Sequence, residues 1–455
     1  MRNRRFRRRE FLRATAAAGL APLLASQRLW GDDGRDGRRP NVIVIFTDDQ
    51  GTLDLNCYGS KDLHTPNLDA LAARGTRFSQ FYVAAPVCSP SRAALLTGRY
   101  PQRAGLAHNA GKKGMPPDQL TIAELLRGAG YRTAIFGKWH LGEEPEFSPL
   151  AQGFDEFFGH KVGCIDNYSH FFYWHGPNRH DLWRNDEERW EDGSYFPDLI
   201  VREAVRFMEA NRDRPFFLYL PFNVPHYPLQ AQEKFRRLYK DAPEPRRMYA
   251  AFVSTLDEKV GQVLAHVDRL GLRSNTLIVF LSDHGHSTEV RTFGGGGNAG
   301  PYRGAKFSLF EGGVRVPCIA SLPGRIPEGA VRDQLATSVD WFPTIADLCR
   351  VDLPTRRLDG VSLAPILRSG TAPDAHETFH WQLRDQWAVR EGDWKLVANG
   401  RDPAVKGKLK GADRLFLSNM RADPTERTNL AAKYPDVVAR LKGLHEAWVS
   451  EVQQQ

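Results

Sequence analysis

The sequence predicts an α/β protein with a large, mostly parallel sheet sandwiched by helices, followed by a smaller C-terminal α+β subdomain with an antiparallel sheet. Short, strongly apolar segments without polar alternation predict strands that are covered on both faces. Helical signals lie between these segments, and strands that alternate with helices form a mostly parallel sheet. Beyond about residue 372 the pattern changes to short alternating segments, which favour hairpins.

The predicted strands are rich in β-branched and aromatic residues. In chain order they are Val42 to Phe46, Thr133 to Phe136, Phe216 to Leu220, Thr276 to Leu281 and Val316 to Ser321.

Helix start, stop and periodicity signals fill the intervals between the strands. Residues 65–75 combine a Thr cap, a Pro at the first helical position and a closing Gly, and Thr121 with Glu124 forms a capping box. Residues 249–270 space their apolar side chains at three to four, as an amphipathic helix does.

The last part of the chain predicts a hairpin and a closing helix. Residues 387–397 alternate about a turn at Glu391-Gly392-Asp393, and a helix is expected over Tyr434 to Val452. We therefore expect a larger α/β domain at residues 31–372 and a small α+β subdomain at residues 373–455.

The positive charge of this 455-residue chain is concentrated at its start. The net charge is +8, but residues 1–30 alone hold eight Arg and one acid, so the remainder is almost neutral. A uniformly basic surface for nucleic acid is therefore not expected. Arg8-Arg9, followed by the apolar residues 14–25, resembles a twin-arginine export signal.

This leader implies that the twin-arginine export machinery is a partner and that the protein is exported, to the periplasm or the extracellular space. No other apolar stretch approaches the length of a membrane span, so an integral membrane protein is not expected. The five cysteines are too few and too scattered for a disulfide scaffold, and whether they pair is left open.

Two acidic pairs directly follow predicted strands. Asp48-Asp49 comes after the first strand, and Asp283-His284 comes after the fourth. Ligands in α/β sheets bind outside the carboxyl ends of strands, so the pairs are expected to meet. Crowded carboxylates favour a hard cation such as Ca²⁺ or Mg²⁺. The alternative for each pair is a simple helix or turn cap.

A second group of residues surrounds Cys88. The segment Pro86 to Gly98 places Cys88 at or just before a helix N-terminus, where an anion is favoured, with Arg92 four residues on. The alternative is that Cys88 is a small apolar residue packed beside a helix cap.

These motifs resemble those of one enzyme family. The pattern C-x-P-S-R with a following apolar pair and T-G, from Cys88 to Gly98, and the segment Gly130 to His140 match the signatures of the formylglycine-dependent sulfatases. This family belongs to the alkaline phosphatase superfamily. The resemblance extends from Asn41 to about Leu430.

The resemblance implies a mechanism. A maturation enzyme would oxidise Cys88 to formylglycine (3-oxoalanine), whose hydrate attacks sulfur and later releases sulfate by eliminating it. One Ca²⁺ ion, rather than Mg²⁺, would be held by Asp48, Asp49, Asp283 and His284, the last at a position where many members have Asn.

The resemblance implies roles for five further residues. Arg92 would support the hydrate and the metal, and Lys138 and Lys306 would bind sulfate oxygens. His140 would assist the hydrate hydroxyl, and His226 would protonate the leaving alkoxide. The alternatives are surface lysines and core histidines.

The implied substrate is a sulfated glycan or an aryl sulfate. A polar-aromatic insertion between His160 and Trp190 is a candidate sugar subsite, or else a surface loop that packs its own aromatics. Two other functions stay open: a phosphate mono- or diester hydrolase of the same fold, and a glycan-binding module with an unmodified Cys88.

Overall fold

The structure, a computed structural model, describes residues 38–405 and 407–453. The predicted export signal at residues 1–30 lies outside the described residues. Among the described helices, none combines the length and the apolar character that a membrane crossing requires. Cys57, Cys88, Cys164, Cys318 and Cys349 are free thiols, which answers the question of pairing for the described chain.

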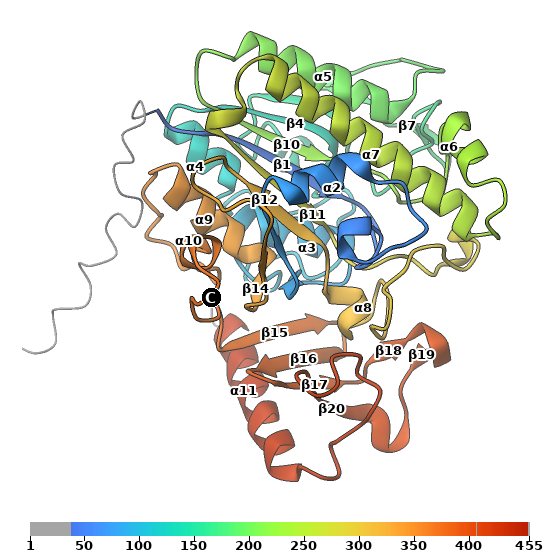
Figure 1. Cartoon of the computed structure of the whole chain (residues 1–455), viewed down its shortest axis with the longest axis vertical. Helices are drawn as coiled ribbons and strands as arrows, with labels where there is room; N and C mark the ends of the chain where they lie inside the picture. The colour runs from blue at the N-terminus through green and yellow to red at the C-terminus, as the bar shows by residue number, and fades with distance from the viewer. Residues whose placement is uncertain (1–37, 406, 454–455) are drawn as a thin grey trace, which may run out of the picture. The chain divides into compact units, whose positions relative to one another are not determined.

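A large mixed sheet organises the fold (Figure 1). Within the described residues it has ten strands, which in spatial order are β13 (Ala330–Arg332), β2 (Thr76–Phe78), β12 (Cys318–Ser321), β11 (Thr276–Ser282), β1 (Asn41–Thr47), β10 (Phe216–Pro221), β4 (Arg132–Lys138), β5 (Glu156–His160), β8 (Trp183–Arg184) and β9 (Glu187–Glu188). The neighbours from β11 to β5 run parallel, with β1 in register between β10 and β11. The predicted parallel centre of the sheet is confirmed.

The described helices lie between and around these strands. They are α2 (Pro66–Ala73), α3 (Cys88–Thr97), α4 (Ile122–Gly128), α5 (Phe196–Ala210), α6 (Glu233–Leu238), α7 (Arg246–Arg269), α8 (Glu311–Val314), α9 (Trp341–Leu348), α10 (Ala364–Arg368) and α11 (Pro435–Gln453). Short 3₁₀ turns are η1 (Asn56–Tyr58), η2 (Pro145–Phe147), η3 (Arg273–Asn275), η4 (Val290–Thr292), η5 (Ser338–Asp340), η6 (Pro403–Val405) and η7 (Gly411–Arg414).

Helices cover both faces of the sheet, as the continuous apolar strands predicted. Ile43 and Ile45 of β1 pack in one core with α2, α5 and α7, and Figure 1 shows α5 and α7 side by side across the sheet. Phe46 points to the opposite face because side chains alternate along a strand. There the guanidinium carbon of Arg92, on α3, lies 5.3 Å from the Phe46 ring centroid.

The predicted helix signals are only partly correct. The Thr121–Glu124 capping box is present at α4, and the long periodic helix is α7. However, the Thr65 side chain does not cap α2; its oxygen accepts the Asn56 backbone N–H instead. Gly75 does not close α2 in the left-handed conformation either. It permits a close approach, since a Cβ there would lie 2.4 Å from the Ala320 carbonyl oxygen.

The small C-terminal antiparallel sheet is also confirmed. Its strands are β15 (Thr378–Leu383), β16 (Gln386–Glu391), β17 (Trp394–Ala398) and β20 (Leu415–Asn419). The β16–β17 hairpin turns at Gly392, where the predicted turn lies, and α11 packs on the sheet through Leu441. The predicted boundary at residues 372/373 stays a prediction.

Buried charges join this small sheet to helix α8 and to Tyr82. Lys395 of β17 contacts Glu311 of α8 at 2.8 Å and Glu426 at 3.1 Å. Arg315 and Arg390 complete the group, Arg315 on Glu311 and Arg390 on the Tyr82 hydroxyl. We call Glu311, Arg315, Arg390, Lys395 and Glu426 the clamp cluster.

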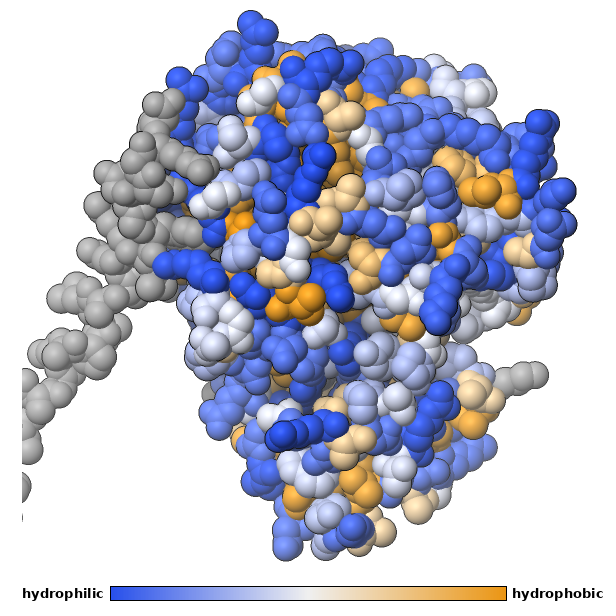
Figure 2. Space-filling view, viewed as in Figure 1, coloured by the Kyte–Doolittle hydropathy of each residue, from blue (hydrophilic) through white to orange (hydrophobic). Residues whose placement is uncertain are grey.

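Three two-stranded ribbons complete the fold. They are β3 (Phe81–Tyr82) with β14 (Ala336–Thr337), β6 (Phe171–Phe172) with β7 (Arg179–His180), and β18 (Arg401–Asp402) with β19 (Gly407–Lys408). On the face shown in Figure 2, apolar side chains gather in small groups among hydrophilic ones.

Candidate active site

The two acidic pairs meet at the carboxyl ends of adjacent strands. Thr47 of β1 pairs with Ser282 of β11, so the residues that follow them are neighbours. The Asp49 backbone N–H donates to Asp283 Oδ1 at 3.1 Å. Asp49 has φ 62°, a left-handed conformation that Asp tolerates better than most residues and that turns its carboxylate into the cluster.

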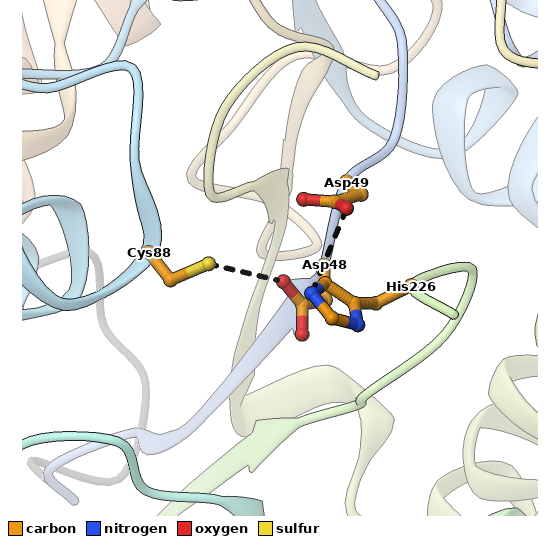
Figure 3. Close-up of side chains that lie close together, drawn as sticks. All are labelled: Asp48, Asp49, Cys88 and His226. Carbon is orange, nitrogen blue, oxygen red and sulfur yellow. Dashed lines mark hydrogen bonds and ion pairs between the residues drawn. The ribbon is translucent and has the colours of Figure 1, made fainter. Parts of the chain in front are cut away.

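Cys88 opens α3 and faces these carboxylates (Figure 3). Its Sγ lies 3.8 Å from Asp48 Oδ1 and 3.4 Å from His284 Nε2, and the residue is 2% exposed. Burial opposes the thiolate, but Lys138 and Lys306 outweigh it and lower the pKa of Cys88 to about 6. The helix N-terminus predicted at Cys88 is confirmed, and its surroundings favour an anion.

Three buried cations lie against the carboxylates. Arg92 Nη2 is 3.0 Å from Asp283 Oδ2 and 3.5 Å from Asp48 Oδ1. Lys138 Nζ is 2.6 Å from Asp48 Oδ2, and Lys306 Nζ is 2.8 Å from Asp49 Oδ1. The lysines and Arg92 are therefore not surface charges. We call Asp48, Asp49, Asp283, Arg92, Lys138 and Lys306 the reaction cluster.

Two histidines present their Nε2 atoms to the reaction cluster. The Nδ1 of His284 is 2.9 Å from the Gly285 carbonyl, and that of His226 is 2.8 Å from the Tyr227 carbonyl. A carbonyl only accepts, so both Nδ1 atoms carry the proton. His284 Nε2 then lies 3.4 Å from Asp49 Oδ1, and His226 Nε2 lies 3.7 Å from Asp49 Oδ2, a contact drawn in Figure 3.

His140 lies at the edge of the cluster. Its carbonyl accepts a hydrogen bond from Ser89 Oγ at 2.6 Å, which ties it to the first turn of α3. Its Nδ1 is buried without a hydrogen-bond partner, and among the described residues its ring makes no ion pair with the reaction cluster. Burial, with Lys138 nearby, holds its pKa well below the usual range, so the ring is neutral.

The carboxylates are incompletely neutralised. Burial raises the pKa of Asp49 to about 7 although Lys306 opposes it, and burial raises that of Asp283 to about 7 against His284. For Asp48, burial is outweighed by Lys138, and its pKa lies well below the usual range. A cation among these oxygens would remove this cost, so the residues fit a hard metal ion.

A cavity of about 700 Å³ lies beside the reaction cluster. Among its lining residues are Tyr173, Trp174, Tyr227, Glu289 and Arg291. Glu289 Oε2 is 3.4 Å from Lys306 Nζ and also pairs with Arg291. Sequence reasoning missed Glu289 and Arg291, because two polar residues in a loop carry no motif.

Part of the predicted aromatic insertion does reach this cavity. The Trp174 ring lies 5.5 Å from the Tyr227 ring, and Tyr227 directly follows His226. The Arg291 guanidinium carbon is 3.8 Å from the centroid of the Trp174 ring. The insertion is therefore more than a surface loop that packs its own aromatics.

Comparison with known families assigns most of the chain. Residues 40–351 match the family model described as sulfatase. The chain belongs to the sulfatase family. A second model, described as N-sulphoglucosamine sulphohydrolase, C-terminal, matches residues 304–449 of this sulfatase.

Two relatives that are similar to this chain are named as sulfatases. Human arylsulfatase A is 35% identical over 450 residues, covering 90% of this chain and 87% of the relative. Dog N-acetylgalactosamine-6-sulfatase is 36% identical over 388 residues, covering 78% and 71%. The protein is thus a sulfatase, and its substrates are sulfated.

Solved structures agree with this assignment. Ps i-CgsB, also solved in complex with k-i-k-neocarrahexaose, superimposes with a TM-score of 0.81 at 31% identity over 90% of this chain and 93% of its own. The phosphonate monoester hydrolase of Agrobacterium radiobacter, at 20% identity and a TM-score of 0.66 over 91% and 96%, shares the fold.

Proposed function

We propose that this sulfatase hydrolyses the sulfate ester of a sulfated carbohydrate or an aryl sulfate, using a formylglycine made from Cys88 and one Ca²⁺ ion. The observation that carries the proposal is the position of Cys88. It opens a helix, lies within 4 Å of Asp48 and His284, and is surrounded by the reaction cluster.

Asp48, Asp49, Asp283 and His284 would hold the Ca²⁺ ion. Bound there, the ion supplies positive charge that offsets the negative charge developing on the sulfate oxygens. His284 suits a ligand role, because its Nδ1–H is fixed on a carbonyl and its Nε2 faces Asp49 and Asp283. Burial alone would lower the pKa of His284, but Asp283 outweighs it and raises the pKa to about 9, so metal binding would release a proton.

Formylglycine supplies, as its hydrate, one hydroxyl that attacks sulfur and a second whose deprotonation ejects sulfate. The chain's own residues prepare this reaction. Lys138 and Lys306 would turn from Asp48 and Asp49 toward the sulfate oxygens once the carboxylates are neutralised by metal. Arg92, fixed between Asp48 and Asp283, would hold the site's geometry around residue 88.

The histidines would move protons. His226 would give the Nε2 proton to the leaving alkoxide, while His140 would assist the hydrate hydroxyl. In the free protein, burial and then the nearby lysines hold the pKa of His226 well below its usual range despite Asp48. A bound sulfate ester adds negative charge and would favour the protonated form that a general acid needs.

The leaving group would occupy the cavity that Trp174, Tyr227 and Arg291 line. Aromatic rings with a few polar groups suit a sugar or aryl body. Two similar proteins support the glycan side, since one is named N-acetylgalactosamine-6-sulfatase and another was solved with k-i-k-neocarrahexaose. We also propose that a maturation enzyme oxidises Cys88 and that residues 1–30 direct twin-arginine export to the periplasm or beyond.

The direct test is sulfate release from a panel of sulfated glycans and aryl sulfates, with Ca²⁺ and matured enzyme. Matched aryl phosphates are included in the panel. Sulfate release that disappears in Cys88→Ala supports the proposal. Activity that survives Cys88→Ala contradicts it. Peptide mass spectrometry of residue 88 confirms maturation in each preparation, and faster phosphate than sulfate release would favour the phosphate-ester alternative.

A second test addresses the leaving-group proton. His226→Ala is expected to lower kcat by roughly 10²–10⁴-fold on alkyl sulfates, the usual range for general acid catalysis. The loss on aryl sulfates is expected to be smaller, because an aryl oxide needs less protonation. Equal losses on both esters, measured side by side, would remove His226 from this role.

A further inference from the structure

The hairpin that carries Trp174 is held at its base by two histidines. Strands β6 and β7 pair antiparallel, with Phe171 opposite His180. His170 immediately precedes β6, and its backbone carbonyl accepts the Asp181 N–H at 3.0 Å. His170 and His180 therefore lie on the two adjacent sides of the hairpin, with ring centroids 6.1 Å apart.

Each ring uses one nitrogen and leaves the other open. His170 Nε2 lies 3.1 Å from the Ser194 carbonyl oxygen, and His180 Nδ1 lies 2.8 Å from Glu188 Oε1. Both partners accept, so these nitrogens carry the protons and the opposite ones carry lone pairs. His170 Nδ1 and His180 Nε2 are both buried without a hydrogen-bond partner.

A carboxylate completes the group. A ligand atom from each of His170, His180 and Asp192 lies within 4.8 Å of the other two. The His170 residue is fully buried, and the His180 side chain is 2% exposed. Asp192 is exposed. Burial, helped by His180, leaves the pKa of His170 below its usual value although the Ser194 contact opposes this, which keeps its lone pair available.

The geometry points to a second metal site, built from His170 Nδ1, His180 Nε2 and the Asp192 carboxylate, that binds Zn²⁺. Two imidazoles and one carboxylate are a common zinc donor set with a fourth position left for water. The Ser194 carbonyl and Glu188 act as the outer partners that orient metal-binding histidines. Zinc–ligand distances of about 2.0–2.2 Å require the three side chains to close together by small rotations.

The site would fix the wall of the leaving-group cavity. The His180 ring is stacked on Trp190 at 4.0 Å, and the His170 ring packs against Phe196 of α5, so the hairpin base is anchored to the main domain. The hairpin tip carries Tyr173 and Trp174, which line the cavity. Zinc would therefore order the tip without touching the reaction cluster.

The test measures zinc directly and needs no turnover. The full chain is prepared as Cys88→Ala with excess Ca²⁺, which removes the reactive thiol and occupies the carboxylates. Zinc is then measured by equilibrium dialysis and elemental analysis. We expect one zinc per chain. His170→Gln and Asp192→Asn are each expected to weaken binding by at least the roughly 10–100-fold that changes to outer partners cost.

The matched control is His175→Ala, which removes an exposed histidine from the same hairpin. It should bind zinc as the parent does. Zinc should also slow hydrogen exchange of residues 171–180 in the parent but not in Asp192→Asn. Because Asp192 is exposed, this substitution is not expected to disturb folding, so misfolding would not explain the difference. No zinc in the parent, or equal zinc in Asp192→Asn and the parent, overturns the site.

Discussion

The reaction cluster and the clamp cluster are both buried networks of acids and bases, yet they are built for different purposes. In the reaction cluster, Asp49 has a pKa of about 7 because burial outweighs Lys306. In the clamp cluster, burial outweighs Lys395 and likewise raises the pKa of Glu426 to about 7. A perturbed carboxyl group therefore does not identify an active site by itself.

The two clusters differ in their surroundings. The reaction cluster surrounds the thiol of Cys88 at a helix N-terminus, and its Lys306 contacts Glu289 on the wall of a cavity. The clamp cluster links α8 to β17, and Lys395 in it is completely buried. Access to a ligand, and not the strength of the electrostatic perturbation, is the difference.

The largest contrast is expected from Asp49→Asn. We expect activity to fall by at least about 100-fold, because a proposed metal ligand is lost, while stability is unchanged or rises. Asn tolerates the φ of 62° at this position, and Lys306 keeps Glu289 as a partner. Urea unfolding and sulfate release are measured on the same sample. A large loss of unfolding free energy would show that the reaction cluster stabilises the fold as the clamp cluster does, and would contradict the contrast between the two.

The opposite pattern is expected from Lys395→Met. Removing one partner of a buried pair costs about 3–5 kcal/mol of unfolding free energy, since it strands the carboxylates. The fold-change in the kcat of the folded protein should be smaller than the fold-change in the equilibrium constant of unfolding. Lys408→Met is the control, because its pair with Asp385 is exposed and worth about 0–1 kcal/mol. Equal effects of the two substitutions on urea unfolding would contradict the clamp role.

The smallest effect is expected from Glu426→Gln, and it depends on pH. The folded pKa of Glu426 is about 7, above its ordinary 4.5, so the folded state holds this proton more tightly than the unfolded chain. Its stabilising contribution is full below about pH 4.5 and is lost as pH rises through 7. The variant should lack this loss, giving a difference of up to about 3 kcal/mol between the two profiles.

Urea midpoints of both proteins across this window provide the measurement. Other groups that titrate there, such as Asp283, are common to both proteins and cancel in the difference. Parallel profiles would show that Lys395 neutralises Glu426 fully in the folded state.

Much of the fold and of the candidate site follows from the sequence, for identifiable reasons. The central strands are covered on both faces, so they are continuous apolar segments that stand out from the chain. The strands at and next to the edges of the sheet gave no such signal, because β2 holds Thr76 and Arg77 and β9 is a pair of glutamates. The antiparallel direction of β12 was equally invisible, since strand direction depends on the connection and not on composition.

The residues of the site also fall into those that the sequence predicts and those that it does not. Asp48 and Asp283 could be predicted because each follows a strand, and Cys88 because the segment from Cys88 to Gly98 resembles a family signature. Glu289 and Arg291 reach the site through tertiary contacts alone. His170 and His180 are ten positions apart, and only the hairpin register brings them together.

The burial of Cys88 also fixes an order of events. Every residue from Phe81 to Tyr100 is buried, so an oxidising enzyme has no path to this thiol once α3 has docked. If Cys88 is oxidised to formylglycine as we propose, this oxidation must therefore compete with folding and finish first. Under this proposal, a chain that folds before oxidation keeps its thiol, so the yield of active molecules depends on the relative rates of oxidation and folding. If residues 1–30 direct export of the folded chain, that competition is decided before the protein leaves the compartment where it is made.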